Sequence, residues 1–335
     1  MRLKRPLKGR SGNMIHSHNS YRAVQLPQNQ DSRLTTAIPN PRTLLFVPGN
    51  QPKMLQKAVG FETKWLIPDL EDSVPASEKE SARKIVTEHI PILAAAGKLL
   101  APRVNSMSSG LAEADINAIV SNDIIGISIG KIGNVEELAA LELIVAAAEI
   151  RAGVEIGRMT ILPWLETAEA VINAYQICKS SDRIRWAAFG AEDFSADMGI
   201  SRTVDETETD SSTIGEPGLA YPRSAVAIAA RAAGVHALDT PFTKFRDPEG
   251  LRAEALLAKS IGYKGKLAIH PAQVEIIESV FKPTEAEITR AKRVLEIAAE
   301  GEAAGRGSIS LDGEMIDMPV ILRAQNVLRD AEISE

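Results

Sequence analysis

The chain has 335 residues, of which 44% are hydrophobic, and its formal net charge at pH 7 is −6. This composition is typical of a globular protein with a sizeable core, and the acidic balance argues against nucleic-acid binding. The single cysteine, Cys178, excludes an internal disulfide framework and fits a reducing compartment. No segment approaches the roughly 20 apolar residues of a membrane-spanning helix, so no membrane partner is expected.

Residues 1–40 differ from the rest of the chain, because they carry seven Lys/Arg and one acid, Asp31. Their polar composition predicts a flexible basic tail, in which His16 and His18 have no assigned role. Low acidity and scattered arginines resemble a transit peptide, but the tail lacks an amphipathic stripe. We therefore expect a cytoplasmic protein, or a mitochondrial-matrix protein if the tail is a transit peptide. Translation from Met14 is a further alternative.

Eight short apolar or β-branched segments recur between residues 42 and 270 and predict strands. They are residues 43–47, 64–68, 99–104, 124–129, 160–165, 184–189, 235–238 and 266–269. Amphipathic segments between them predict helices at residues 77–90, 135–150, 168–180, 222–233 and 248–261. The first of these helices opens with Ser77 and Glu80 at capping-box spacing.

Alternation of strands and helices implies a parallel sheet, and eight such units imply a closed (β/α)8 TIM barrel. We assign residues 41–282 to this barrel. An open doubly wound sheet is the alternative fold, but the first unit lacks the glycine fingerprint of a dinucleotide or phosphate site.

Polar residues follow most of the predicted strands, at the end of the barrel where active sites form. These segments are Pro48-Gly49-Asn50, Asp69-Leu70-Glu71-Asp72, Arg103-Val104-Asn105, Lys131, Glu166, Glu192-Asp193, Asp239-Thr240 and His270-Pro271. Glu166 and Asp193 each close an apolar segment, and two such carboxylates can share a hard cation such as Mg²⁺. The sequence therefore predicts a metal-assisted enzyme.

The chain resembles the HpcH/HpaI aldolase and citrate lyase β-subunit-like superfamily over residues 41–329. The matching segments are Arg42-Thr-Leu-Leu-Phe-Val-Pro-Gly-Asn50, Asp69-Leu-Glu-Asp-Ser-Val74, Arg103-Val-Asn105, Leu165-Glu-Thr-Ala168, Phe189-Gly-Ala-Glu-Asp-Phe194, Asp239-Thr-Pro-Phe242 and Gly265-Lys-Leu-Ala-Ile-His-Pro-Ala-Gln273. The resemblance is strongest to the stand-alone lyases of malyl-, methylmalyl- and citramalyl-CoA.

This resemblance implies Mg²⁺, or Mn²⁺, at Glu166 and Asp193, and reversible carbon–carbon cleavage of a 3-hydroxyacyl-CoA. The products would be an acyl-CoA and a 2-oxo acid, glyoxylate or pyruvate, with Arg103 binding the oxo acid. One departure is visible, because the fourth strand ends in Gly130-Lys131 where the family usually has Pro-Lys.

The C-terminal residues 283–335 contain a segment, 308–319, that resembles the lid of the same lyases. The resemblance implies that Asp317 acts as the acid/base in the active site of a neighbouring subunit. It therefore also implies a homo-oligomer, either a trimer or a pair of trimers.

Other motif residues have less specific expected roles. Glu71 and Asp72 would hold a metal-bound water or orient Arg103, with a charge cluster at a helix entrance as the alternative. Asn105 would support the Arg103 loop. Arg42, Lys79 and Arg83 are candidate anchors for CoA, although basic residues on helix surfaces are usually only solvated.

His270 and Pro271 are expected near the CoA entrance, with a catalytic His270 as the alternative. Lys131, counted among the substrate-binding residues, also admits a Schiff-base aldolase mechanism. Asp239 is expected to support the site or the strand end, and Asp197 to belong to a loop. Residues 202–218 would form a mobile loop, and Cys178 a packed thiol.

Three alternatives to a CoA lyase remain open from the sequence. The enolate or product could pass to water, which would make the protein a thioesterase of malyl-CoA-type substrates. The chain could be a citryl carrier-protein lyase subunit, against which the lid and Asp317 count. It could also be a binding barrel without chemistry, against which the combination of Glu166, Asp193, Arg103 and Asp317 counts.

Overall fold

The structure is a computed structural model that describes residues 38–200, 217–303, 305 and 309–332. The predicted tail, apart from its last three residues, lies outside this range. The predicted loop 202–218 also lies outside it, apart from its last two residues. None of the described helices combines the length and the apolar character needed to cross a bilayer.

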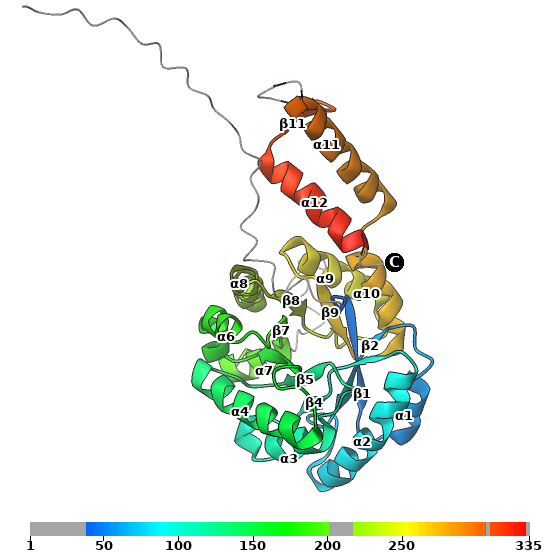
Figure 1. The fold of residues 1–335 in the computed structure, drawn as a ribbon, viewed down its shortest axis with the longest axis vertical. Helices are drawn as coiled ribbons and strands as arrows, with labels where there is room; N and C mark the ends of the chain where they lie inside the picture. The colour runs from blue at the N-terminus through cyan, green and yellow to red at the C-terminus, as the bar shows by residue number, and fades with distance from the viewer. Residues whose placement is uncertain (1–37, 201–216, 304, 306–308, 333–335) are drawn as a thin grey trace, which may run out of the picture.

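Parallel strands form a closed barrel with helices around it (Figure 1). β1 (Thr43–Pro48) closes the ring, because it pairs with both β2 (Trp65–Asp69) and β9 (Gly265–Ala268). The other strands, in order around the ring, are β3 (Leu99–Leu100), β4 (Arg103–Val104), β5 (Gly126–Ile129), β6 (Thr160–Leu165), β7 (Trp186–Phe189) and β8 (His236–Asp239). The predicted (β/α)8 fold is confirmed, and the open-sheet alternative is wrong.

The predicted strand at residues 99–104 is divided into β3 and β4, which both pair with β2 and share one of the eight positions in the ring. Pro102 lies between them and has no N–H to give to the ladder. Its carbonyl still accepts a hydrogen bond from the Ser128 N–H, so the barrel stays closed across the break.

The helices pack around the outside of the barrel. They are α1 (Pro52–Ala58), α2 (Lys79–Ala95), α3 (Ala112–Ile119), α4 (Val135–Ala152), α5 (Ala168–Ile172), α6 (Ala174–Ser180), α7 (Ala191–Met198), α8 (Pro217–Ala233), α9 (Pro248–Ser260) and α10 (Val274–Phe281). Four short helices, α1, α3, α7 and α10, were not predicted. The predicted helix 168–180 is interrupted at Asn173, whose side chain donates to the Gly133 carbonyl.

The predicted capping box at Ser77 is wrong. Ser77 lies inside a 3₁₀ turn, η1 (Ala76–Glu78), that precedes α2. Glu78 is the N-cap of α2 and makes no capping hydrogen bond through its side chain. The Pro75 backbone favours this extra turn, because proline fixes φ at a value compatible with a helix start.

The inside of the barrel is filled by side chains from alternating strand positions. At the amino ends of β2 and β7, the Trp65 and Trp186 rings meet edge to face at 5.1 Å. Nearer the carboxyl ends, Phe46 and Trp164 lie 5.5 Å apart and form an aromatic floor. The interior is thus a packed core at its amino end, with the Phe46–Trp164 floor above it toward the carboxyl end.

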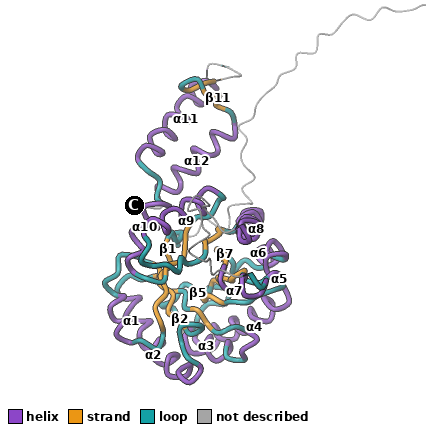
Figure 2. Tube along the Cα trace, turned by 180° about the vertical axis from the view of Figure 1, so that it is seen from behind, coloured by secondary structure: helices purple, strands orange, loops and turns teal. Residues whose placement is uncertain are grey.

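The C-terminal residues form a helical hairpin that projects from the barrel (Figures 1 and 2). α11 (Glu285–Ala303) and α12 (Met318–Glu332) pack together, and the two-stranded β10 (Ile309–Leu311) and β11 (Glu314–Ile316) lie at the distal tip. The hairpin has its own small core, formed by Ala291, Val294, Ile316 and Ala324.

Candidate active site

Arg103 is the centre of the candidate site, at the carboxyl end of the barrel. Its Nε and Nη2 donate to both oxygens of Asp69, each at 2.7 Å. Asp69 is the direct register partner of Arg103 on the neighbouring strand, so the sheet itself brings the pair together. The guanidinium lies over the floor, 4.8 Å from the Phe46 ring centroid and 5.7 Å from that of Trp164.

Two acids from the segment after β2 also contact Arg103. Its Nη1 donates to Asp72 at 2.9 Å and lies 3.3 Å from Glu71. Asp72 is 55% exposed, whereas Glu71 is buried. The structure thus places both acids where the sequence hypothesis needs them for orienting Arg103.

Lys131 links the Arg103 group to Asp193. Its ammonium lies 3.3 Å from a carboxylate oxygen of Glu71 and 3.3 Å from one of Asp193. Lys131 has a φ of 62°, a left-handed conformation that non-glycine residues rarely adopt. This turn also aims its backbone N–H at Glu166, which accepts it at 3.0 Å.

Glu166 is buried directly after β6, between two glycines. A Cβ at Gly130 would lie 2.4 Å from one of its carboxylate oxygens, and a Cβ at Gly190 only 2.3 Å from the other. The backbones of the strands on either side therefore fit closely around the carboxylate. The departure from the family pattern at Gly130 falls at this contact.

Asp193 lies in the first turn of α7, four residues beyond the end of β7. The Thr240 hydroxyl accepts a hydrogen bond from the Ala191 N–H and so fixes the start of this helix. Asp197, on the next turn, accepts from the Ala168 N–H at 2.7 Å and ties α7 to the segment after Glu166.

The surroundings raise the pKa values of Glu166, Glu71 and Lys131, but for different reasons. Burial, together with the charges of Asp193 and Glu71, raises the pKa of Glu166 well above its usual range, and burial also raises the pKa of Glu71. Burial opposes the Lys131 ammonium, but the charges of Glu71, Asp193 and Glu166 outweigh it and raise the pKa of Lys131. Since a Schiff-base lysine must be neutral to attack, this environment counts against that mechanism.

The donor set fits a divalent cation. Five carboxylates and two cations meet at this end of the barrel, which leaves a formal charge of −3. No three His, Cys, Asp or Glu side chains among the described residues are arranged to hold a metal. Mg²⁺, however, usually takes only one or two carboxylates, with water and substrate completing its octahedron. The pair predicted for this role, Glu166 and Asp193, lies close enough for the Asp193 charge to raise the pKa of Glu166.

Three of the predicted binding residues have internal partners. The Lys79 ammonium donates to the Leu70 and Glu71 carbonyls, at 2.8 and 2.6 Å. Arg83 pairs with Asp115 at 2.8 Å, and Asn105 donates to the same carboxylate at 2.6 Å. These contacts shape the loops that carry Glu71 and Arg103.

The roles of Asp69 and Asp115 were not predicted from the sequence. Both are almost completely buried, and both anchor a predicted site residue. For Asp69 a signal existed, because it ends β2 beside the strand that carries Arg103. Asp115 lies in the unpredicted helix α3, so nothing in the residue pattern marked it as buried.

Other predicted residues lie elsewhere. His270 and Pro271 are exposed after β9, and the His270 ring stacks on Phe245 at 5.2 Å. Arg42 lies at the opposite, amino end of the barrel, where it donates to the Asp330 carbonyl. Asp239 forms a buried network with Lys266 and Arg223, which supports the strand end.

Asp317 is remote from the Arg103 group of its own chain. It directly follows β11 at the distal tip of the hairpin, where it is exposed and caps α12 through the Val320 N–H. At 1.5 Å per residue, it lies about 20 Å along the helix from Asp330, which contacts the amino end of the barrel.

Similarity to known proteins covers most of the chain. The citrate lyase subunit beta of Leuconostoc mesenteroides subsp. cremoris is 37% identical over 288 residues, covering 86% of this chain and 92% of that protein. The L-malyl-CoA/beta-methylmalyl-CoA lyase of Rhodobacter capsulatus is 29% identical, covering 88% and 95%.

The fold is shared with a solved structure, that of the protein CitE of Mycobacterium tuberculosis in complex with magnesium, acetoacetate and coenzyme A. It superposes with a TM-score of 0.69 at 24% identity, covering 87% of this chain and 98% of that one. The sequence model of one family matches residues 42–271, which span every strand of the barrel. The chain therefore belongs to the HpcH/HpaI aldolase/citrate lyase family.

Proposed function

We propose that the protein is a Mg²⁺-dependent carbon–carbon lyase that reversibly cleaves a 3-hydroxyacyl-CoA into an acyl-CoA and a 2-oxo acid, glyoxylate or pyruvate. The observation that carries the proposal is the placement of two carboxylates, Glu166 and Asp193, beside an anchored guanidinium, Arg103. The malyl-CoA lyase relative and the CitE complex with magnesium, acetoacetate and coenzyme A support it.

Glu166 and Asp193 would hold the metal, which supplies a Lewis acid for the carboxylate and oxo oxygens of the oxo acid. Arg103 has five N–H donors, and Asp69 and Asp72 take three of them. Of the remaining two, the one on Nη1 lies beside Glu71, and the one on Nη2 would be available to the developing oxyanion. A fixed donor aimed at such a charge is commonly worth about 3–4 kcal/mol.

The acid/base role falls to Asp317 of another subunit. Asp317 lies between two exposed methionines, Met315 and Met318, at the distal tip of a projecting hairpin. A carboxylate flanked by apolar side chains can enter a site while the methionines exclude water. We therefore propose a homo-oligomer, a trimer or a hexamer, in which each hairpin completes a neighbouring site.

The CoA chain would enter beside His270 and Pro271, where Phe245 and His270 offer an exposed aromatic surface. Lys79 and Arg83 already have internal partners. Their main role would therefore be to shape the loops that carry Glu71 and Asn105, not to bind CoA directly.

A second candidate is the β-subunit role in citrate lyase. The specific observation in its favour is the higher identity to the Leuconostoc citrate lyase subunit beta, 37% against 29% for the malyl-CoA lyase. The two candidates differ in the carrier of the thioester, which is an acyl carrier protein in one and free CoA in the other.

A coupled assay separates these candidates. Purified protein with Mg²⁺ and racemic malyl-CoA or citramalyl-CoA should release glyoxylate or pyruvate without free thiol, and a chelator should suppress the release. Asp193→Ala should abolish this turnover, whereas the exposed, remote Asp123→Ala should leave it unchanged.

Thiol without oxo acid would identify a thioesterase instead. Turnover of a citryl carrier protein, with both CoA thioesters left intact, would select the citrate lyase role. Full Mg²⁺-dependent activity in Asp193→Ala would remove the metal assignment.

A further inference from the structure

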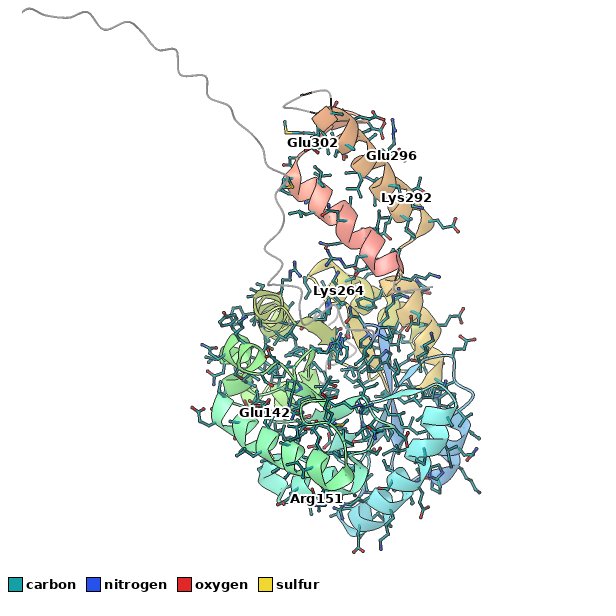
Figure 3. The ribbon with its side chains drawn as sticks, in the orientation of Figure 1. Glu142, Arg151, Lys264, Lys292, Glu296 and Glu302 are labelled. Atoms are coloured by element: carbon teal, nitrogen blue, oxygen red, sulfur yellow. The ribbon has the colours of Figure 1, made fainter. Side chains whose placement is uncertain are left out.

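The amino end of the barrel, opposite the candidate active site, contains two adjoining cavities of about 530 and 570 Å³. Both are lined by Asn40, by His236 at the start of β8, and by Lys264 just before β9. The last three turns of α12 form the outer wall, and Lys264 lies where that helix meets the barrel (Figure 3). Each cavity falls in the size range of small-molecule sites.

The lining is strongly cationic in a chain with a net charge of −6. Six Lys/Arg and two acids line the combined space, which gives it a formal charge of +4. Part of this charge serves the fold, because Lys264 pairs with the Asp330 carboxylate and Arg42 donates to the Asp330 carbonyl. Arg323 lines the first cavity and Arg231 the second, and neither forms an ion pair or a hydrogen bond with any described residue, so both charges remain in excess.

Arg185 adds a buried guanidinium beside the same space. Its side chain is only 5% exposed, yet its Nε and Nη2 have no hydrogen-bond partner among the described residues. It neighbours two lining residues, because its carbonyl accepts from the His236 N–H and its guanidinium lies over Trp186, which donates to Asn40. An unpaired buried cation is costly unless an anion compensates it.

The surrounding cations also act on His236. Burial, with the positive charges of Lys264, Arg231 and Arg185, lowers its pKa to about 4, against a partial opposing effect of Asp330. His236 is therefore neutral at physiological pH and can hydrogen-bond a ligand without adding charge. The space thus combines guanidinium forks with a neutral hydrogen-bonding group, a combination suited to oxyanions.

We propose that the two adjoining amino-end cavities together form a second binding site, for a small metabolite that carries two or more carboxylate or phosphate groups. Arg231 on α8 and Arg323 on α12 would each bind one of its oxyanion groups, and the Arg185 guanidinium beside His236 would add positive charge nearby. Binding would fasten the hairpin to the barrel. The proposal does not depend on the reaction at the other end.

Calorimetric titration of the full-length, metal-free protein with pyrophosphate, and separately with tricarballylate, tests the site. We expect one saturable site per subunit that the double substitution Arg231→Gln/Arg323→Gln weakens by at least about tenfold, since two charge-assisted contacts are lost. Arg293→Gln, an exposed arginine on the same hairpin, is the matched control and should change the affinity by less than about twofold.

Hydrogen exchange localises the binding. The ligand should protect residues 323–332 and 231–236 in the wild type and not in the double variant. Preference for pyrophosphate would assign phosphate esters as the ligand class, and preference for tricarballylate would assign polycarboxylates. Absence of binding by either probe, or equal binding by the double variant, would overturn the proposal.

Discussion

Arg103 illustrates how a single side chain is fixed for chemistry. Its two-pronged bond to Asp69, its contact with Asp72 and the Phe46–Trp164 floor leave it little freedom. A group held in this way loses little entropy when substrate binds. Arg103 was singled out by its motif. The end of β2 marks Asp69 as a neighbour of the Arg103 strand, but the pairing itself depends on strand register, which one sequence does not specify.

Replacement of Asp69 tests this anchoring. Asp69→Asn keeps the shape but removes the charge that fixes the guanidinium, so we expect kcat/KM to fall about 10–100-fold. Asp72→Asn removes a single contact from a half-exposed acid and should cost several-fold less. Steady-state kinetics on both variants would show the difference, and equal losses would refute the anchoring role.

Glu166 should make stability depend on pH. Because its pKa is raised in the folded state, its contribution to stability is present below the usual pKa of 4.5 and is lost as the pH rises through the raised value. In a chelating buffer near pH 8, Glu166→Gln should therefore melt at a higher temperature than the wild type, with the advantage disappearing near pH 4.5.

Mg²⁺ provides the control for that comparison. It should raise the melting temperature of the wild type and leave Glu166→Gln unchanged, since an amide does not replace the charge of the ligand. If Glu166→Gln melted below the wild type at pH 8, neighbouring groups of the protein would have to stabilise the ionised Glu166 carboxylate, and the prediction would be wrong.

At the scale of elements, the periodicity of the sequence predicted each position in the barrel but not its interruptions. The strand at residues 99–104 was predicted as continuous. Pro102 divides it into β3 and β4 because proline has no backbone N–H to donate to the neighbouring strand. Helices α1, α3 and α7 are too short for a periodic signal to stand out. The missed helix α7 also affects the description of the site, because Asp193 lies in the first turn of this helix and not at a strand end.

The end of β7 offers a test of how strand ends shape the site. In Gly190→Ala the new methyl group would meet the Cβ and a carboxylate oxygen of Glu166 at 2.6 and 2.3 Å. We expect the affinity for Mg²⁺ to fall by at least about tenfold, because the methyl group displaces the Glu166 carboxylate without removing it. Gly60→Ala, where the nearest atom is 3.7 Å away, is the control, and calorimetry would compare them.

At the scale of the whole molecule, the proposed sharing of sites between subunits through the projecting hairpin can be tested by complementation. Asp193→Ala and Asp317→Ala should each be nearly inactive as pure proteins. Subunits co-expressed from the two variants should regain activity, because some mixed sites combine an intact metal pair with an intact Asp317. Activity measured on the purified mixed oligomer checks this, and the absence of recovery would place Asp317 in its own subunit's site or outside the reaction.

The Trp65–Trp186 contact, which closes the amino end of the barrel, has a kinetic consequence. The proposed lyase would therefore have a single mouth, at the carboxyl end, and an oxo acid bound beneath the acyl-CoA would be trapped behind it. In the cleavage direction of the proposed reaction the acyl-CoA would depart first and the oxo acid last. In the condensation direction the order reverses, and saturating acyl-CoA should inhibit by blocking the way in.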